Sequence, residues 1–266
     1  MRRIAIFAIG ILAALPAFSQ APPAGAPGAT GAAAAAAKGP HPKSREENDA
    51  LLAMFKTPDP DAQIKASQDL LSKYPDTDYK SQALIVQAQA YHAKKDEPKA
   101  IVAAESALDA DPKSYDTMLL LAEIYSRTTR ATDLDMDDRI AKSDKFAKEA
   151  LALLATAEKP KPDMADADWE GLKQGETQRA WVALGFTSLL RKKYDDAKAN
   201  FEKGIALYPD PLDMLYIERA YMTAKRYDDA ISWIDKVSAS PNANDNLKKI
   251  ATNDKAHIEV LKKQAQ

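Results

Sequence analysis

The sequence predicts an all-α protein in which antiparallel helix pairs stack on one another and a single helix closes the C-terminal end. Apolar residues recur at helical spacing in segments separated by proline and aspartate, and no segment alternates apolar and polar residues over a useful length. One arrangement of small and large residues also occurs in two distant segments. Such repetition is typical of solenoids, in which each helix pair packs only against its neighbours.

The repeated arrangement is clearest between Trp181 and Pro209. It begins W-x2-L-G, and an alanine lies sixteen residues after the tryptophan, a phenylalanine four residues later and a proline eight residues beyond that. The segment from Leu84 to Pro112 has an alanine and a proline at the same two distances from its first residue. Both segments resemble the tetratricopeptide repeat, a family whose antiparallel helix pairs build a right-handed α-solenoid.

The resemblance covers residues 44–237 with two interruptions and implies one helical-repeat domain at 44–266. The expected repeats and the capping helix after them lie at 44–76, 81–114, 115–158 (with an insertion), 178–210, 211–242 and 245–264. Extra residues around 127–138 are expected to form a loop or to extend the preceding helix. The segment 159–175, which contains Trp169, is interpreted as a second insertion, and such insertions often serve binding.

Small residues are expected wherever two helices of a pair approach closely. The small residues at such positions are Ala88, Ala100, Ala107, Ala122, Gly185, Ala197 and Gly204. Enlarging Gly185 to leucine should therefore overpack its helix pair. Glu218 stands at the corresponding position of the last repeat, so this repeat departs from the family pattern.

The N-terminal residues predict export from a bacterial cell. Two arginines precede an apolar run at 4–15, and small residues at positions 17 and 19 have the spacing of a signal-peptide cleavage site. We interpret 1–19 as a cleaved signal peptide. A retained membrane anchor is the alternative, although the run is shorter than the roughly 20 residues that span a bilayer. Residues 20–43, which are rich in Ala, Gly and Pro, are expected to form a disordered tether.

Charge and cysteine content narrow the functional classes. A formal net charge of −2, from 37 basic and 39 acidic side chains, argues against a nucleic-acid partner or an anionic lipid surface. The sequence has no cysteine, which excludes a disulfide framework, a thiol nucleophile and a lipid-modified cysteine. We therefore expect a soluble protein, periplasmic or secreted, without stable membrane insertion after signal cleavage.

No group of residues points to catalysis, to a cofactor or to a metal. His41, His92 and His257 belong to different predicted segments, and their spacing fits neither a metal site nor a catalytic pair. The sequence also contains no Gly-rich phosphate loop, nucleophile elbow or zinc-protease helix. The sequence therefore predicts a protein that is not an enzyme and that needs no cofactor.

One acidic segment has two interpretations. Asp133, Asp135 and Asp137 alternate like the first ligands of a calcium loop, with Ile140 and Asp144 at later ligand offsets. Asp138 stands where such a loop requires glycine. The other interpretation is that these aspartates cap and begin a helix at 136–154, because acidic side chains stabilise helix N-termini.

In tetratricopeptide proteins the first helix of each pair lines a concave surface that holds a protein or peptide. The lining positions that the resemblance implies here are Gln82, Ile85, Gln89, His92, Asp116, Leu119, Glu123, Arg179, Val182, Phe186, Leu189, Leu215, Arg219 and Met222. The apolar residues Val182, Phe186 and Leu189 are interpreted either as a partner contact or as residues buried under a neighbouring segment. Ile85 and Gln89 stand where family members that clamp a terminal carboxylate have lysine and asparagine, so that clamp is not expected.

The function that follows is a non-enzymatic interaction module or scaffold of the bacterial cell envelope, which binds a protein or peptide. A structural component of an envelope or outer-membrane assembly complex is the first alternative, because residues 70–107 also resemble periplasmic repeat proteins of that kind. A hydrolase, with its site formed by Trp169 and the insertions, is the second, although no nucleophile and base converge there.

Overall fold

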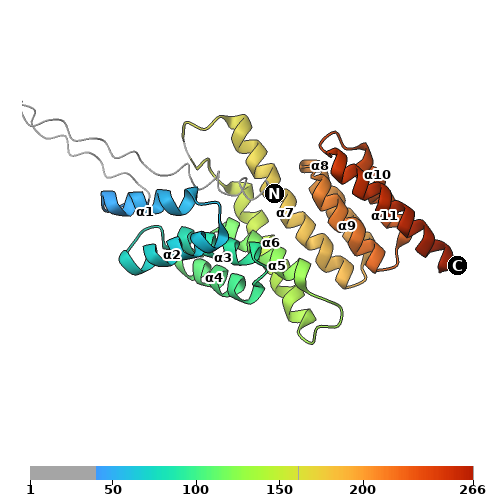
Figure 1. Cartoon of the computed structure of the whole chain (residues 1–266), viewed down its shortest axis with the longest axis horizontal. Coiled ribbons are helices and arrows are strands. Elements are labelled where there is room, and N and C mark those ends of the chain that lie inside the picture. The colour runs from blue at the N-terminus through green and yellow to red at the C-terminus, as the bar shows by residue number, and fades with distance from the viewer. Residues whose placement is uncertain (1–39, 161, 266) are drawn as a thin grey trace, which may run out of the picture. The chain divides into compact units, whose positions relative to one another are not determined.

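In the residues that the computed structural model of the chain describes, 40–160 and 162–265, all regular secondary structure is α-helical (Figure 1). The helices are α1 (Arg45–Lys56), α2 (Pro60–Lys73), α3 (Lys80–Ala93), α4 (Glu97–Ala110), α5 (Tyr115–Thr128), α6 (Met136–Thr156), α7 (Asp166–Leu190), α8 (Tyr194–Leu207), α9 (Pro211–Thr223), α10 (Tyr227–Ala239) and α11 (Asp245–Gln264). The predicted all-α fold of packed helix pairs is confirmed. None of these helices combines the length and the apolar character needed to cross a membrane. The expected signal peptide and nearly all of the expected tether lie outside the described residues.

The helices belong to two compact units. One unit contains α1 to α4 and the short segment 159–163, and the other contains α5 to α11. We call them the N-terminal unit and the C-terminal unit.

In the N-terminal unit, side-chain caps fix where the first helices begin. The Ser44 hydroxyl accepts a hydrogen bond from the Glu47 amide at 3.0 Å, and the Asp59 carboxylate accepts one from the Ala62 amide at 2.9 Å. Pro60 occupies the first turn of α2, where its missing amide hydrogen is not needed. The core of α1, α2 and the start of α3 consists of Leu51, Met54, Phe55, Leu70, Tyr79, Ala83 and Val86.

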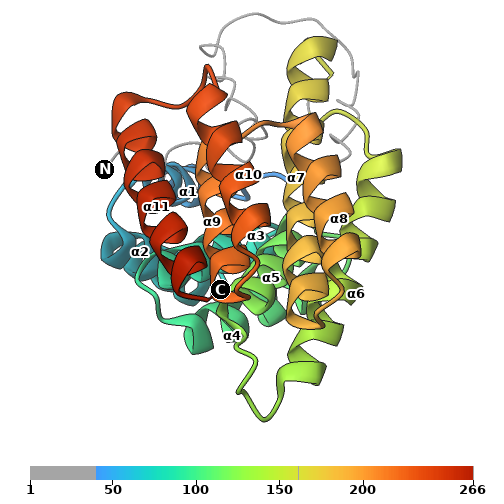
Figure 2. The same cartoon turned by 90° about the vertical axis from the view of Figure 1, so that its right-hand side faces the viewer.

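The C-terminal unit is built from successive helix pairs. The first helices α5, α7 and α9 contact one another in series, and each packs against the helix that follows it, α6, α8 or α10. Helix α11 packs on both α10 and α9 and so closes the end of the stack (Figure 2). One continuous apolar core runs from α7 to α11 and has Phe201, Tyr221 and Trp233 at its centre, with ring centroids 6.0 and 6.2 Å from that of Phe201.

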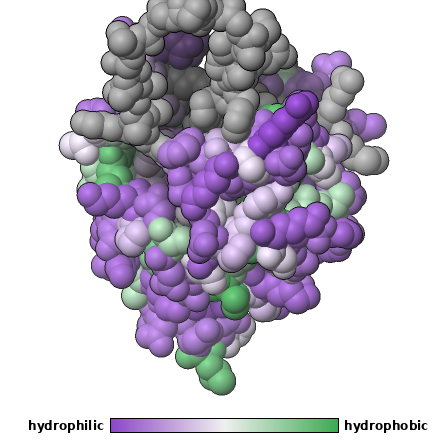
Figure 3. Space-filling model, turned by 90° about the vertical axis from the view of Figure 1, so that its left-hand side faces the viewer, coloured by the Kyte–Doolittle hydropathy of each residue, from purple (hydrophilic) through white to green (hydrophobic). Residues whose placement is uncertain are grey.

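The surface contrasts with these cores. On the face of the molecule drawn in Figure 3, the side chains are mainly hydrophilic, and apolar residues appear only in small separate patches. Single apolar residues on a surface are ordinary and mark no binding site by themselves.

Gly185 on α7 marks a close approach between α7 and α8. A methyl group placed there would lie 2.3 Å from the ring of Phe201 on α8, which is far inside van der Waals contact. The Phe201 side chain is completely buried. This position therefore requires the absence of a side chain, in agreement with the small residue that the repeat pattern has there.

Three helix pairs share one turn geometry that the sequence pattern did not predict. Lys95, Lys192 and Lys225 follow α3, α7 and α9 and have left-handed backbones, with φ values of 62°, 60° and 57°. The amide of each next residue donates to the carbonyl five residues before it, at 2.9 Å in all three turns. These are Schellman motifs, which satisfy carbonyls at a helix end and in which glycine is the usual left-handed residue.

The second expected insertion is mostly helical. Helix α7 begins at Asp166, so most of 159–175 extends the first helix of its pair. Trp169 is thus a buried residue of α7, exposed by 9%, and not part of a loop. Gly171 and Gly175 fall inside this helix, with nothing within 4 Å of a methyl group at either position. Of the residues around 127–138, 129–135 form the loop between α5 and α6.

Glu218 is the clearest departure from ordinary packing. The residue has no exposed surface, and neither of its carboxylate oxygens makes a hydrogen bond. The pKa of Glu218 is raised to about 7, mainly by burial and also by the negative charge of Asp254 on α11, against a smaller opposing effect of Arg219. The template position that holds glycine or alanine elsewhere thus carries a buried carboxyl group here.

Candidate functional site

The structure divides the expected lining residues between the two units. In the N-terminal unit, Ile85 is buried, whereas Gln82, Gln89 and His92 are partly exposed. His92 Nδ1 lies 2.8 Å from Glu97 Oε2, so this histidine already has a partner within its own helix pair. These four residues stay a prediction for the N-terminal unit.

In the C-terminal unit, the apolar residues of the expected lining belong to the core. Val182, Phe186, Leu189 and Leu215 are exposed by 1, 8, 8 and 2% and lie in the core that joins α7 to α11; Leu119 on α5 is equally buried, at 1%. Of the two interpretations of Val182, Phe186 and Leu189, the structure therefore shows burial. The expected lining residues with exposed surface in this unit are polar or flexible: Asp116, Glu123, Arg179, Arg219 and Met222.

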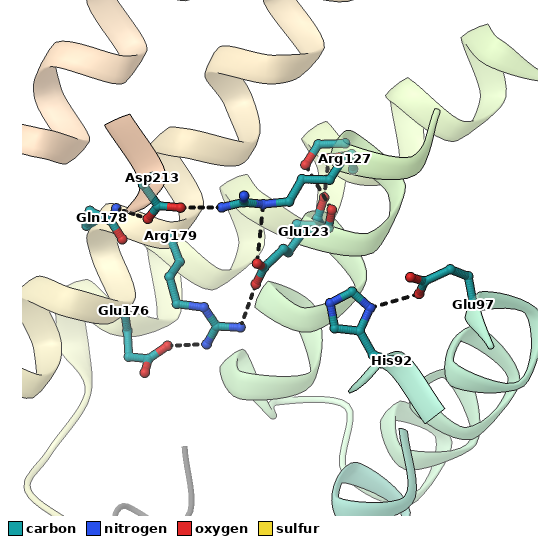
Figure 4. Close-up of polar contacts among 11 residues, drawn as sticks. His92, Glu97, Glu123, Arg127, Glu176, Gln178, Arg179 and Asp213 are labelled. Carbon is teal, nitrogen blue, oxygen red and sulfur yellow. Dashed lines mark hydrogen bonds and ion pairs between the residues drawn. The ribbon is translucent and has the colours of Figure 1, made fainter. Parts of the chain in front are cut away.

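A network of ion pairs joins α5, α7 and α9 (Figure 4). Arg127 Nη2 donates to Asp213 Oδ1 at 2.5 Å, and Arg127 Nε lies 3.3 Å from Glu123 Oε1. The amide group of Gln178 donates to the other oxygen of Asp213 at 2.6 Å. Asp213 is thereby held from two sides, by one side chain of α5 and one of α7.

Arg179 extends the same network along α7. Its Nη1 donates to Glu176 Oε2 at 2.7 Å, and its Nη2 donates to Glu123 Oε2 at 3.2 Å. Glu123 therefore bridges the two arginines, with one oxygen toward each (Figure 4). Because the side chains of Arg127 and Arg179 are only 21 and 15% exposed, these ion pairs are shielded from solvent and hold their geometry better than exposed pairs do.

Arg127 also stacks on aromatic rings. Its guanidinium lies 5.2 Å from the ring centroid of Phe186 on α7 and 4.7 Å from that of Tyr216 on α9. Cations over aromatic faces are attracted by the ring quadrupole. Tyr216 is 42% exposed, so it presents the outer side of this stack to solvent.

Asp116, at the start of α5, completes the group. The pKa of Asp116 is raised to about 7, mainly by burial and also by the nearby charge of Glu176, while Arg179 acts in the opposite direction. Within the described part of the chain, no hydrogen bond or ion pair engages this carboxylate. We call the residues Asp116, Glu123, Arg127, Glu176, Arg179, Asp213 and Tyr216 the α5–α7–α9 face.

Sequence reasoning named only part of this face. The lining positions implied by the repeat included Asp116, Glu123 and Arg179, but missed Arg127, Glu176, Asp213 and Tyr216. Arg127 lies four residues after Glu123, and Glu176 three residues before Arg179, which are the helical spacings of ion pairs. Asp213 and Tyr216 had no such signal, because their partners are on other helices.

The acidic segment before α6 does not gather its side chains around one point. An Asp133 carboxylate oxygen accepts a hydrogen bond from the Arg130 amide at 2.8 Å, whereas Asp144 accepts from Thr187 of α7 and from Arg191, the residue that follows α7, at 2.5 and 2.8 Å. Among the residues that the structure describes, no group of three histidine or acidic side chains is placed to hold a metal ion. Asp137 and Asp138 lie in the first turn of α6, where acidic residues favour the helix.

Comparison with known proteins agrees with this architecture. Residues 178–211 match the family model of the tetratricopeptide repeat, which covers α7 from Gln178 onward and all of α8. The chain contains a tetratricopeptide repeat. Among solved structures it is similar to a thermophilic tetratricopeptide repeat protein of Thermus thermophilus, with a TM-score of 0.55 and 15% identity over 78% of this chain and 97% of that one.

A second solved structure is only a distant likeness. It is the assembly chaperone of RpL4, with a TM-score of 0.36 and 10% identity over 83% of this chain and 98% of that one. Comparison with curated proteins gives no match. The tetratricopeptide-repeat assignment thus applies to the fold and to residues 178–211.

Proposed function

We propose that the chain is a non-enzymatic interaction module of the bacterial cell envelope, which binds a protein or peptide through the first helices of its repeats. Tetratricopeptide repeats generally mediate protein–protein interactions, and the α7–α8 pair is such a repeat. The observation that carries the proposal is the α5–α7–α9 face. It combines polar groups held in place by ion pairs with the exposed ring of Tyr216, on three successive first helices.

Preorganisation supports a binding function for this face. The ion pairs of Arg127 and Arg179 fix the side chains of α5, α7 and α9 before any partner arrives. A partner would therefore lose less free energy to side-chain ordering than it would on a flexible surface. Tyrosine is also enriched at protein interfaces, because it buries a large area with few rotatable bonds.

Export to the periplasm or medium is part of the proposal and is supported by the sequence alone. Two arginines, an apolar run at 4–15 and small residues at 17 and 19 have the order of a signal peptide. Expression of the full chain followed by N-terminal sequencing of the periplasmic and culture fractions tests this part. A mature protein that begins at Gln20 is expected, whereas a chain that is uncleaved and confined to the cytoplasm contradicts export.

Site-specific photocrosslinking tests the binding function directly. The crosslinking amino acid p-benzoyl-phenylalanine is introduced into the full chain in place of Tyr216, and the protein is irradiated in an extract of its source cells. Because Tyr216 lies on the α5–α7–α9 face and is exposed, discrete crosslinked products identified by mass spectrometry are expected.

Tyr208 provides the matched control. It is 48% exposed, compared with 42% for Tyr216, but it follows α8, the second helix of its pair. The same substitution at Tyr208 should give none of the discrete products. If both positions give the same products, or Tyr216 gives none, this face is not the binding surface.

A further inference from the structure

Both arginines of the α5–α7–α9 face are already neutralised within the protein. Arg127 pairs with Glu123 and Asp213, and Arg179 pairs with Glu176 and Glu123. A partner carboxylate could bind either guanidinium only by displacing one of these shielded carboxylates, which would then lose its own partner. The face is therefore poorly suited to an acidic segment.

Acidic groups are in excess on the same face. Four carboxylates, those of Asp116, Glu123, Glu176 and Asp213, accompany the two guanidinium groups of Arg127 and Arg179. The surplus is concentrated near Asp116, where the charges of Glu176 and Asp116 act against each other. A positive group placed between them would relieve this repulsion and give Asp116 the ion pair that it lacks.

We propose that the α5–α7–α9 face recognises a lysine- or arginine-bearing segment of a partner protein, with the cationic side chain placed between Asp116 and Glu176. This inference rests on the proposed function and adds the chemistry of the partner. Electrostatic complementarity selects partners by the sign of their charge, because like charges brought together are strongly unfavourable. Tyr216 offers the remainder of the segment an exposed aromatic ring on the same face.

Fluorescence anisotropy with three synthetic peptides tests the sign of the charge. The peptides share one unstructured alanine–serine sequence and carry lysine, glutamine or glutamate at the same spaced positions. The titrations use the full chain at pH 8, at which Asp116 is predominantly ionised because its pKa is about 7. The lysine peptide should bind about tenfold more tightly than the glutamine peptide, and the difference should shrink as salt is added.

Two substitutions test the location. Asp116→Asn and Glu176→Gln should each weaken binding of the lysine peptide by about fivefold. Asp137→Asn is the matched control for the first, because Asp137 occupies the same first-turn position of α6 that Asp116 occupies of α5. Glu149→Gln, at an exposed position of α6, is the control for the second. Both controls change the net charge by the same amount and should leave the affinity unchanged.

The outcomes separate this inference from the proposed function. Equal binding of the three peptides, preference for the glutamate peptide, equal loss in the control variants, or no binding of the lysine peptide would each overturn the basic-segment inference. Photocrosslinking at Tyr216 in the cell extract would still succeed in those cases if the chain binds a partner of different chemistry. If crosslinking fails but the lysine peptide binds as expected, the face recognises a basic segment, but the proposed function as a module that binds a protein of the source cells is contradicted.

Discussion

The α7–α8 and α9–α10 pairs use the same turn but fill the same template position in opposite ways. Both first helices end in a Schellman motif with a left-handed lysine, Lys192 or Lys225. In the first pair the position is Gly185, which the ring of Phe201 presses against. In the second it is Glu218, fully buried and without a hydrogen bond. Backbone geometry thus repeats more faithfully than side-chain packing, because the turn depends on local residues and the packing on the helix that arrives next.

The largest expected effect comes from filling the tight position. Gly185→Leu should lower the free energy of unfolding by about 3 kcal/mol, because even a methyl group at this position would meet the buried Phe201 ring at 2.3 Å. Thermal denaturation followed by circular dichroism measures the loss. Gly171→Leu is the control on the same helix, where nothing lies within 4 Å of an added methyl group. It should be neutral or slightly stabilising, and equal melting of the two variants would contradict the tight contact.

The second effect concerns the buried carboxyl group. The pKa of Glu218 is about 7 in the folded protein, compared with 4.5 for an ordinary glutamate. Between these two values the Glu218 carboxyl group is protonated in the folded state and ionised in the unfolded state. The contribution of Glu218 to the free energy of unfolding therefore falls as the pH rises through the window between these two pKa values. Glu218→Gln should raise the free energy of unfolding by about 2 kcal/mol at pH 8 and change it little below the window.

Urea denaturation at both ends of the pH window measures this gain. Glu149→Gln, at an exposed position, should show no pH-dependent difference from the parent. A Glu218→Gln variant with the same stability increment at every pH would show that burial of the charge is not its cause.

The smallest effect tests the shared turn. Lys192→Gly and Lys225→Gly should each raise the free energy of unfolding by about 1 kcal/mol, because glycine adopts a left-handed backbone without the steric penalty of a side chain. Lys198→Gly, in the middle of α8, should instead lower it by about 1 kcal/mol. Chemical denaturation measures the changes in the free energy of unfolding. A gain in the two turn variants and a loss in Lys198→Gly would confirm the shared turn geometry, whereas a loss in all three variants would contradict it.

Local signals in the sequence were sufficient for most of the fold. Ser44 and Asp210 are residue types that favour helix N-caps, and they begin α1 and α9 as side-chain caps, while Gly185 marks a close helix contact. The start of α7 was missed because Gly171 and Gly175 lower helix propensity, whereas the helix continues through both.

The candidate face was harder to predict because it depends on residues from three helices. The repeat placed Asp116, Glu123 and Arg179 among the lining positions, but it could not show that Phe186 would be covered by the core. Asp213 receives its hydrogen bonds from Arg127 and Gln178, 86 and 35 residues earlier in the chain. Contacts at such separations have no periodic signature in a single sequence.

Helix α7 has a consequence for how the C-terminal unit comes apart. With 25 residues it is about 37 Å long, compared with about 21 Å for α8, and it touches α5, α6, α8 and α9. Solenoids assembled from equal hairpins can fray one hairpin at a time from an end. Here, unfolding of α7 removes packing contacts from α5, α6, α8 and α9 at once. These helices should therefore unfold together with α7 in one cooperative transition.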